Sequence, residues 1–136
     1  MNPETIVLRF GLAIVIIGVA AFAYWMINQR LLLRARNNVF TLFNALPNKP
    51  VLVYFTTPDC APCKTIQRPA INRISSLLGE QVEVIEIDAT QRPDLAKVWG
   101  VMSVPTTFVL DATGEARYVN NGIARAEKLL EQIQTL

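Results

Sequence analysis

The chain of 136 residues has no histidine and only two cysteines, Cys60 and Cys63. A tetrahedral zinc site takes four ligands, mostly Cys or His, so this chain cannot complete one unless carboxylates or a second chain contribute. Two cysteines also cannot form the framework of a disulfide-rich secreted domain. The sequence has no basic block interleaved with aromatic residues, which argues against a nucleic-acid partner.

The two cysteines are separated by Ala61 and Pro62 and follow an apolar stretch, residues 51–55. This pattern predicts a buried strand that gives way to a helix at the cysteines. On the first helical turn, Cys60 would face unpaired N–H groups and the positive end of the helix dipole, which favour a thiolate. Cys63 would lie one turn further on the same face, within reach of Cys60. The pair is therefore predicted to be a reversible dithiol.

Zinc binding and a structural disulfide are the alternatives to redox exchange at this pair. Zinc would need ligands that the chain does not supply as Cys or His. A disulfide across so short a loop would constrain the unfolded chain only slightly, so it would be a weak structural crosslink. Pro62 suits a first helical turn and stiffens the loop between the sulfurs. Redox exchange is the favoured interpretation.

Near the N-terminus, residues 10–27 contain no charged side chain, and residues 5–8 extend the apolar run beyond Arg9. As a helix this stretch is long enough to cross the hydrocarbon core of a bilayer, with Arg9 extending toward the head groups. Tyr24 and Trp25 fall where an aromatic belt would lie. We therefore expect residues 1–29 to be a single-pass anchor that contacts lipid through residues 5–29.

Two other interpretations of this segment stay open at the sequence level. Ala21 and Ala23 give the small-x-small form of a signal-peptide cleavage site, although the apolar run continues past it. A core helix is disfavoured because the run has no polar face.

The arginines near the span bear on the side of the membrane. Arg30, Arg34 and Arg36 follow the span, whereas Arg9 and the terminal amine precede it. The positive-inside rule then favours a cytoplasmic domain. The excess of positive charges after the span is small, and an extracytoplasmic domain stays an alternative.

The rest of the chain is expected to comprise a juxtamembrane linker at residues 30–38 and one domain at residues 39–136, which is long enough for a single core. The expected elements are a helix at 39–46, a strand at 51–55, a helix at about 60–78 kinked at Pro69, a strand at 82–88, a helix at 94–99, a strand at 101–110, a turn at 111–114, a strand at 115–119, a loop at 120–122 and a helix at 124–136. The strand–helix–strand order predicts a parallel pair.

The two long helices of the domain each carry an apolar stripe that is expected to face the core. These stripes comprise Ile66, Ala70, Ile71, Ile74, Leu77 and Leu78 in the first helix, and Ala126, Leu129, Leu130 and Ile133 in the last.

Several further motifs accompany the cysteine pair in a fixed order. They are residues 51–55, Cys60-Ala61-Pro62-Cys63-Lys64, Trp99-Gly100-Val101, Val104-Pro105-Thr106, Thr113-Gly114-Glu115 and Asn121-Gly122. On these motifs the chain from about residue 39 onward resembles a thioredoxin domain. The resemblance implies an α/β, thioredoxin-like three-layer fold with a central mixed sheet. The N-terminal apolar segment lies outside the resemblance.

The resemblance also implies roles for the cysteines and their neighbours. Cys60 would attack a substrate disulfide, and Cys63 would resolve the resulting mixed disulfide. Ala61 and Pro62 would support the pair, and Pro105 would follow a cis peptide bond beside it. The redox-active disulfide would be the only redox group, with no separate cofactor and no metal.

Substrate contacts are expected from two further loops. The backbone of Ser103 and Val104 would pair with an extended substrate segment, with Thr106 and Gly122 beside it. The partners would be protein disulfides or dithiols and an unidentified electron donor.

The chain also departs from the family pattern. Tyr54 stands where the family has a buried acid, and Val84 where it has a lysine. Asp59 would either disfavour the Cys60 thiolate or cap the helix. Pro69 comes one residue later than in the common pattern. These departures bear on rate and redox potential.

The sequence as a whole predicts a membrane-tethered thiol-disulfide oxidoreductase that reduces protein disulfides. The alternatives are a thiol oxidase or isomerase, and a binding module without turnover.

Overall fold

The computed structural model describes residues 3–37 and 47–136, and backbone contacts divide the chain into two compact units, residues 1–30 and 31–136. Each unit is described by itself. The helix expected at residues 39–46 lies outside the described residues.

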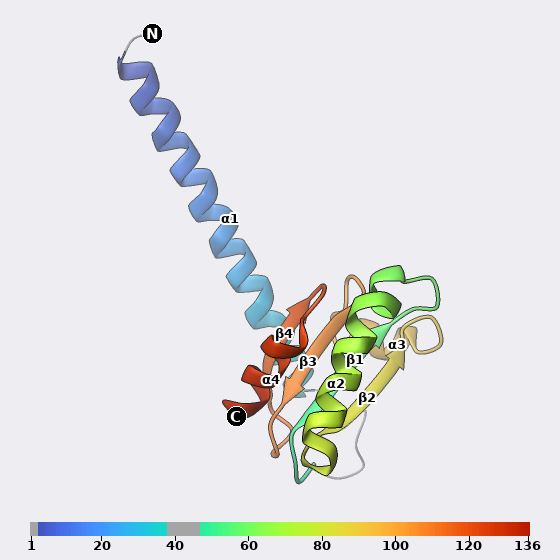
Figure 1. Ribbon diagram of the computed structural model, residues 1–136. Helices are drawn as coiled ribbons and strands as arrows, with labels where there is room; N and C mark the ends of the chain where they lie inside the picture. The colour runs from blue at the N-terminus through green and yellow to red at the C-terminus, as the bar shows by residue number, and fades with distance from the viewer. Residues whose placement is uncertain (1–2, 38–46) are drawn as a thin grey trace. The chain divides into compact units, whose positions relative to one another are not determined.

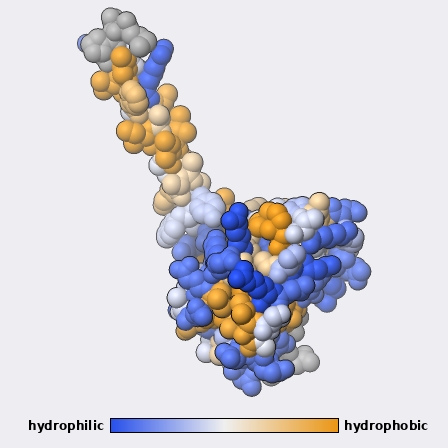
Figure 2. Space-filling view, viewed as in Figure 1, coloured by the Kyte–Doolittle hydropathy of each residue, from blue (hydrophilic) through white to orange (hydrophobic). Residues whose placement is uncertain are grey.

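The first unit is formed by most of helix α1 (Pro3–Asn37). Residues Glu4–Ala35 are long and apolar enough to cross a membrane, with a mean hydropathy of 2.5 in their most apolar part, none of which is buried. Figure 2 shows a largely hydrophobic surface along this helix. The expected N-terminal apolar helix is therefore confirmed. A signal sequence has the same properties.

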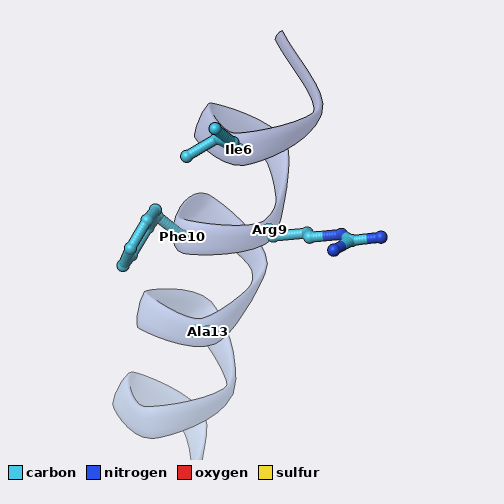
Figure 3. Close-up of a pocket in the computed structure, with 4 residues that line it drawn as sticks. All are labelled: Ile6, Arg9, Phe10 and Ala13. Atoms are coloured by element: carbon cyan, nitrogen blue, oxygen red, sulfur yellow. The ribbon is translucent and has the colours of Figure 1, made fainter. Parts of the chain in front are cut away.

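A shallow recess on α1 is lined by Ile6, Arg9, Phe10 and Ala13. Ile6 and Phe10 project from one side of the helix while Arg9 projects away from them (Figure 3). The recess lies on the surface of one helix, so it lacks the enclosure that a small-molecule site requires.

The second unit is built on a four-stranded mixed sheet, which confirms the predicted fold class. Its strands are β1 (Val51–Thr56), β2 (Glu83–Asp88), β3 (Thr106–Leu110) and β4 (Ala116–Asn121), in the order β2-β1-β3-β4. Strand β1 pairs parallel with β2 and antiparallel with β3, and β3 pairs antiparallel with β4. The parallel pair is the one that the strand–helix–strand order predicts.

Strand β1 is buried along its whole length because both faces of the sheet are covered. Its alternating side chains enter two clusters, one with Val51, Val53 and Phe55 and the other with Leu52 and Tyr54. Helices α2 (Arg68–Leu78) and α4 (Ala126–Gln134) cover the face of Leu52 and Tyr54, and α2 is seen along the sheet in Figure 1. Helix α3 (Pro93–Val98) contributes to the opposite cluster. The three layers therefore hold the C-terminal end of β1, where the cysteines follow, in a rigid setting.

The last turns of α1 belong to the core of this second unit. Leu31 is 4% exposed and Ala35 is fully buried, and both lie in the cluster that contains Trp99. Gly100 follows with a φ of +71°, and a Cβ placed there would lie 2.8 Å from Cδ2 of Leu31. The expectation that residues 30–38 are only a linker therefore needs correction. Leu31 and Ala35 are four residues apart and share one helical face, which packs on the domain.

The helix after the cysteines differs from the continuous α-helix expected at residues 60–78. A π-helical turn, η2 (Cys63–Gln67), precedes α2, and the Arg68 amide donates to the Cys63 carbonyl, five residues back. The wider turn rotates the side chains, so that Gln67 is fully buried and Ile66 is 44% exposed. Pro69 lies at the start of α2, directly after the π-turn.

Further along α2 the predicted apolar stripe is only partly correct. Ile71 and Ile74 are buried as expected, and Ala70 and Leu78 are partly buried against them. Leu77 is 58% exposed, so its predicted inward position is wrong. The helix ends at Gly79, whose φ is +51°, and a 3₁₀ turn, η3 (Gly79–Gln81), follows.

Two strand boundaries also differ from expectation. Strand β3 begins at Thr106 rather than at residue 101, because residues 101–105 form a loop, in which the Val104–Pro105 bond is cis. Strand β4 extends through Asn120 and Asn121, which were expected in a loop. The buried Asn120 amide donates to Thr107 Oγ1 at 3.1 Å and to Gln132 Oε1 at 2.9 Å, so its polar atoms are satisfied within the strand.

The C-terminal helix agrees with its predicted core face. Helix α4 buries Ala126, Leu129 and Ile133, with Leu130 partly buried beside them. Its start at Ala126 is two residues later than expected.

Candidate redox site

The two cysteines form a disulfide directly after β1. Their Cα atoms are 5.2 Å apart, and the Cys63 amide donates to Cys60 Sγ at 3.2 Å. Cys60 is 8% exposed and Cys63 is 1% exposed. Cys60 is therefore the more exposed of the two cysteines, and Cys63 lies almost wholly inside the domain.

The backbone around Cys60 sets its position at the start of the helical segment. The Cys60 amide donates to the Thr57 carbonyl at 3.2 Å, and the Lys64 amide donates to the Cys60 carbonyl at 3.3 Å. Ala61 and Pro62 are exposed between the cysteines, and Pro62 has a helical φ of −64°. The Cys63 amide, which donates to the Cys60 sulfur, belongs to this N-terminal turn.

A second loop carries the predicted proline beside the cysteines. The Val104–Pro105 bond is cis, as the sequence resemblance implies, and Val104 packs against the cluster that contains both cysteines. The Thr106 hydroxyl donates to the Ser103 carbonyl at 2.7 Å. Thr106 is 1% exposed, so its side chain supports this loop from inside, whereas Ser103 is exposed. Of these residues, Ser103 is exposed and Val104 is partly exposed.

The loop after β4 is joined to the proline loop. The Gly122 amide donates to the Pro105 carbonyl at 2.8 Å. Gly122 has a φ of +96°, a conformation that strains other residues, and no atom lies within 4 Å of the place of its missing Cβ. Gly122 is therefore required for the path of the chain rather than for a close approach.

Tyr54 lies below the cysteine turn, where the family pattern has a buried acid. Its hydroxyl donates to the Cys63 carbonyl at 3.3 Å, and its side chain is 1% exposed. Burial raises the pKa of the Tyr54 phenol above its ordinary value of 10.0. The phenol is thus neutral at physiological pH and acts as a hydrogen-bond donor, not as a base for Cys63.

Replacing Tyr54 with Phe should therefore leave the pH profile of thiol exchange between about pH 6 and 9 unchanged, while costing about 1 kcal/mol of stability for the lost hydrogen bond. The raised pKa means that the folded state retains the proton longer than the unfolded state, so wild-type stability falls as pH rises above 10.0. Tyr54→Phe lacks this loss. Urea unfolding at neutral and alkaline pH should show that the difference in free energy of unfolding between wild type and Tyr54→Phe becomes smaller above pH 10.0. A gap that stays constant would contradict the raised pKa.

The sequence did not single out Gln67, which the structure places in the site. Its Nε2 donates to the Ala124 carbonyl at 3.0 Å, and the Ala124 amide donates to its Oε1 at 2.8 Å. The only sequence signal is the late position of Pro69, because one additional residue in a helix is accommodated as a π-turn.

The arrangement is suited to two-electron exchange through sulfur. Among residues 3–37 and 47–136, no group of three or more His, Cys, Asp or Glu side chains lies close enough to hold a metal ion. The Cys60–Cys63 disulfide itself supplies one reaction, the making and breaking of its sulfur–sulfur bond.

Comparison with known proteins finds matches to one family model, to related sequences and to solved structures. A family model described as Thioredoxin matches residues 33–135. A thioredoxin-like protein of Synechocystis sp. is 34% identical over 86 residues, which cover 63% of this chain and 80% of that protein. Thioredoxin Y of Oryza sativa chloroplasts is 29% identical over 105 residues, covering 75% of this chain and 61% of that one. A solved thioredoxin structure from Halobacterium salinarum is 26% identical with a TM-score of 0.58, covering 65% of this chain and 74% of that one.

Proposed function

This chain belongs to the thioredoxin family, and on that premise we propose that it is a membrane-tethered reductase of protein disulfides. Thiol-disulfide exchange in general follows from the family together with the Cys60–Cys63 disulfide. The observation that supports the proposed reaction is the unequal exposure of the two cysteines, 8% for Cys60 and 1% for Cys63. A partner would therefore meet Cys60 first, and Cys63 would attack only afterwards.

The proposed reaction has two exchange steps. The Cys60 thiolate attacks one sulfur of a substrate disulfide, forms a mixed disulfide and releases the other sulfur as a thiolate. The Cys63 thiolate then attacks Cys60 Sγ, forms the Cys60–Cys63 bond and releases the second substrate thiolate. Two electrons pass from the dithiol to the substrate, and the two protons of the dithiol end on the two substrate thiols. A donor of reducing equivalents must then restore the dithiol.

The substrate is proposed to bind as an extended segment along the proline loop. Ser103 and Val104 directly precede Pro105; Ser103 is exposed, and Val104 is partly buried against the cysteine cluster. Main-chain hydrogen bonds to such a stretch read the shape of a partner more than its side chains. Gly122, joined to Pro105, would form the neighbouring wall.

Tethering is proposed through residues 1–29, with lipid contacts at residues 5–29. The support is the apolar, unburied helix in this region. The arginine count favours a cytoplasmic domain, and labelling of Cys60 in intact cells by a membrane-impermeant thiol reagent, after reduction, tests the side. Labelling would place the domain outside the cytoplasm, and protection would support the arginine count.

Insulin reduction tests the reaction itself. The full-length chain in detergent, supplied with dithiothreitol, is expected to accelerate insulin precipitation, and Cys60→Ser is expected to match the uncatalysed rate. Equal rates for the two proteins would reject the proposal and favour a binding module. Equilibration with glutathione tests the direction of electron flow. A reduction potential of the Cys60–Cys63 pair well above that of the glutathione couple would assign the protein as an oxidase or isomerase.

A further inference from the structure

Gln67 is the one fully buried amide side chain in the helical segment that carries Cys63. It is 0% exposed, and it makes two hydrogen bonds with the backbone of a single residue, Ala124. The two residues are 57 positions apart in the chain. Gln67 therefore joins the turn of Cys63 to the loop that begins at Gly122.

The π-turn is what allows this contact. The Arg68 amide bonds to the Cys63 carbonyl, so the turn that begins at Cys63 holds one more residue than an α-helical turn. The extra residue rotates Gln67 inward and leaves Ile66 at the surface. Burying an amide in place of an aliphatic side chain is costly unless both its polar atoms are paired, and here both are.

The same loop is also tied to the proline loop. Gly122, two residues before Ala124, donates its amide hydrogen to the Pro105 carbonyl. Ala124 itself lies in the cluster with Cys60 and Cys63. The Gln67–Ala124 and Gly122–Pro105 hydrogen bonds, joined by the backbone of residues 122–124, thus connect the Cys63 turn with the two loops proposed to hold the substrate.

We propose that Gln67 is a positioning residue for the second exchange step, a role that rests on the proposed function. In that step the attacking Cys63 sulfur, the Cys60 sulfur and the departing substrate sulfur must come into line. Cys63 is positioned by the π-turn, and the substrate sulfur by the loops at Val104 and Gly122. Gln67 fixes the position of Cys63 relative to the loops that hold the substrate sulfur. Small misplacements of reacting atoms have large effects on rate.

Gln67→Met tests this role because methionine has similar length and no hydrogen-bonding amide. The matched control is Gln132→Met, which removes another amide pair, between Gln132 and Asn120, at a place outside the cysteine cluster. Both variants are expected to lose comparable stability. Only Gln67→Met is expected to alter the second step.

The two steps are measured separately with the reduced full-length chain in detergent. The substrate is an unstructured cysteine peptide in mixed disulfide with thionitrobenzoate. Attack by Cys60 releases the coloured thiolate, and acid quenching followed by mass spectrometry gives the lifetime of the Cys60–peptide adduct. In Gln67→Met we expect the release of colour to stay within about twofold of wild type and the adduct to persist about tenfold longer.

A second variant keeps the test valid if Gln67→Met does not fold. In Gln67→Glu the carboxylate can accept from the Ala124 amide but cannot donate to its carbonyl, whereas the protonated acid can do both. Burial raises the pKa of such a carboxyl. The rate of adduct resolution relative to wild type at the same pH should therefore rise as the pH is lowered from about 8 to about 6.

The outcomes distinguish a failure of the role proposed for Gln67 from a failure of the proposed reductase function. If wild type forms no adduct and releases no colour, the proposed function fails. If wild type turns over normally and Gln67→Met resolves its adduct as fast as Gln132→Met, Gln67 has only a structural role and the inference fails. A Gln67→Glu ratio that does not change with pH would also overturn it.

Discussion

Replacing Cys63 with serine is expected to convert the protein into a trap for its substrates. In the proposed mechanism the first exchange needs only Cys60, the more exposed of the two cysteines. Resolution needs the neighbouring thiol, which reacts at a very high effective concentration because it is held within the same turn. Without it, turnover should fall by about a thousandfold or more while the adduct accumulates.

The measurement is non-reducing electrophoresis of membranes that contain Cys63→Ser, followed by identification of the proteins released by dithiothreitol. Cys60→Ser is the matched control, because its remaining sulfur is 1% exposed and should capture almost nothing. Stronger capture by Cys60→Ser than by Cys63→Ser would show that the two cysteines have the opposite roles.

Replacing Leu31 with alanine is expected to destabilise the domain by about 2–5 kcal/mol, although the residue lies within the segment first expected to be a linker. Leu31 is 4% exposed in the cluster around Trp99, so its truncation leaves a cavity. The control is Leu33→Ala in the same helix, where the side chain is 56% exposed and the expected change is within about 0.5 kcal/mol.

Urea unfolding measures both variants in a Trp25→Phe background, so that fluorescence reports the buried Trp99 alone. A chain that starts at residue 38 should likewise be less stable than one that starts at residue 30, since it lacks both Leu31 and Ala35. Equal midpoints for Leu31→Ala and Leu33→Ala would show that the end of α1 does not contribute to the core.

The sheet and the cysteine turn were predictable because their signals are local. An unbroken apolar stretch such as residues 51–55 indicates a buried strand, and Cys60 and Cys63 are the only cysteines in the chain. The cis bond before Pro105 came from the family resemblance, since a Val-Pro pair alone favours trans.

The remaining features depend on tertiary contacts that periodicity does not record. The predicted stripe assumed 3.6 residues per turn, so the π-turn at Cys63–Gln67 turned Ile66 outward and buried Gln67, for which no position had been predicted. Leu31 has the composition of either a membrane-interface helix or a core helix, and only packing on Trp99 distinguishes the two. Asn120 joined a strand because Thr107 and Gln132 satisfy its amide.

The depth of Cys63 also has a bearing on chemical damage. A peroxide that reaches the site meets Cys60 first and converts its thiolate to a sulfenic acid. Because the buried thiol lies within bonding distance, it can condense with that sulfenic acid to give the disulfide and water before a second oxidation makes the damage irreversible. The buried Cys63 thiol is thus expected to protect Cys60 from irreversible oxidation, because the sulfenic acid is converted to the same disulfide that turnover produces.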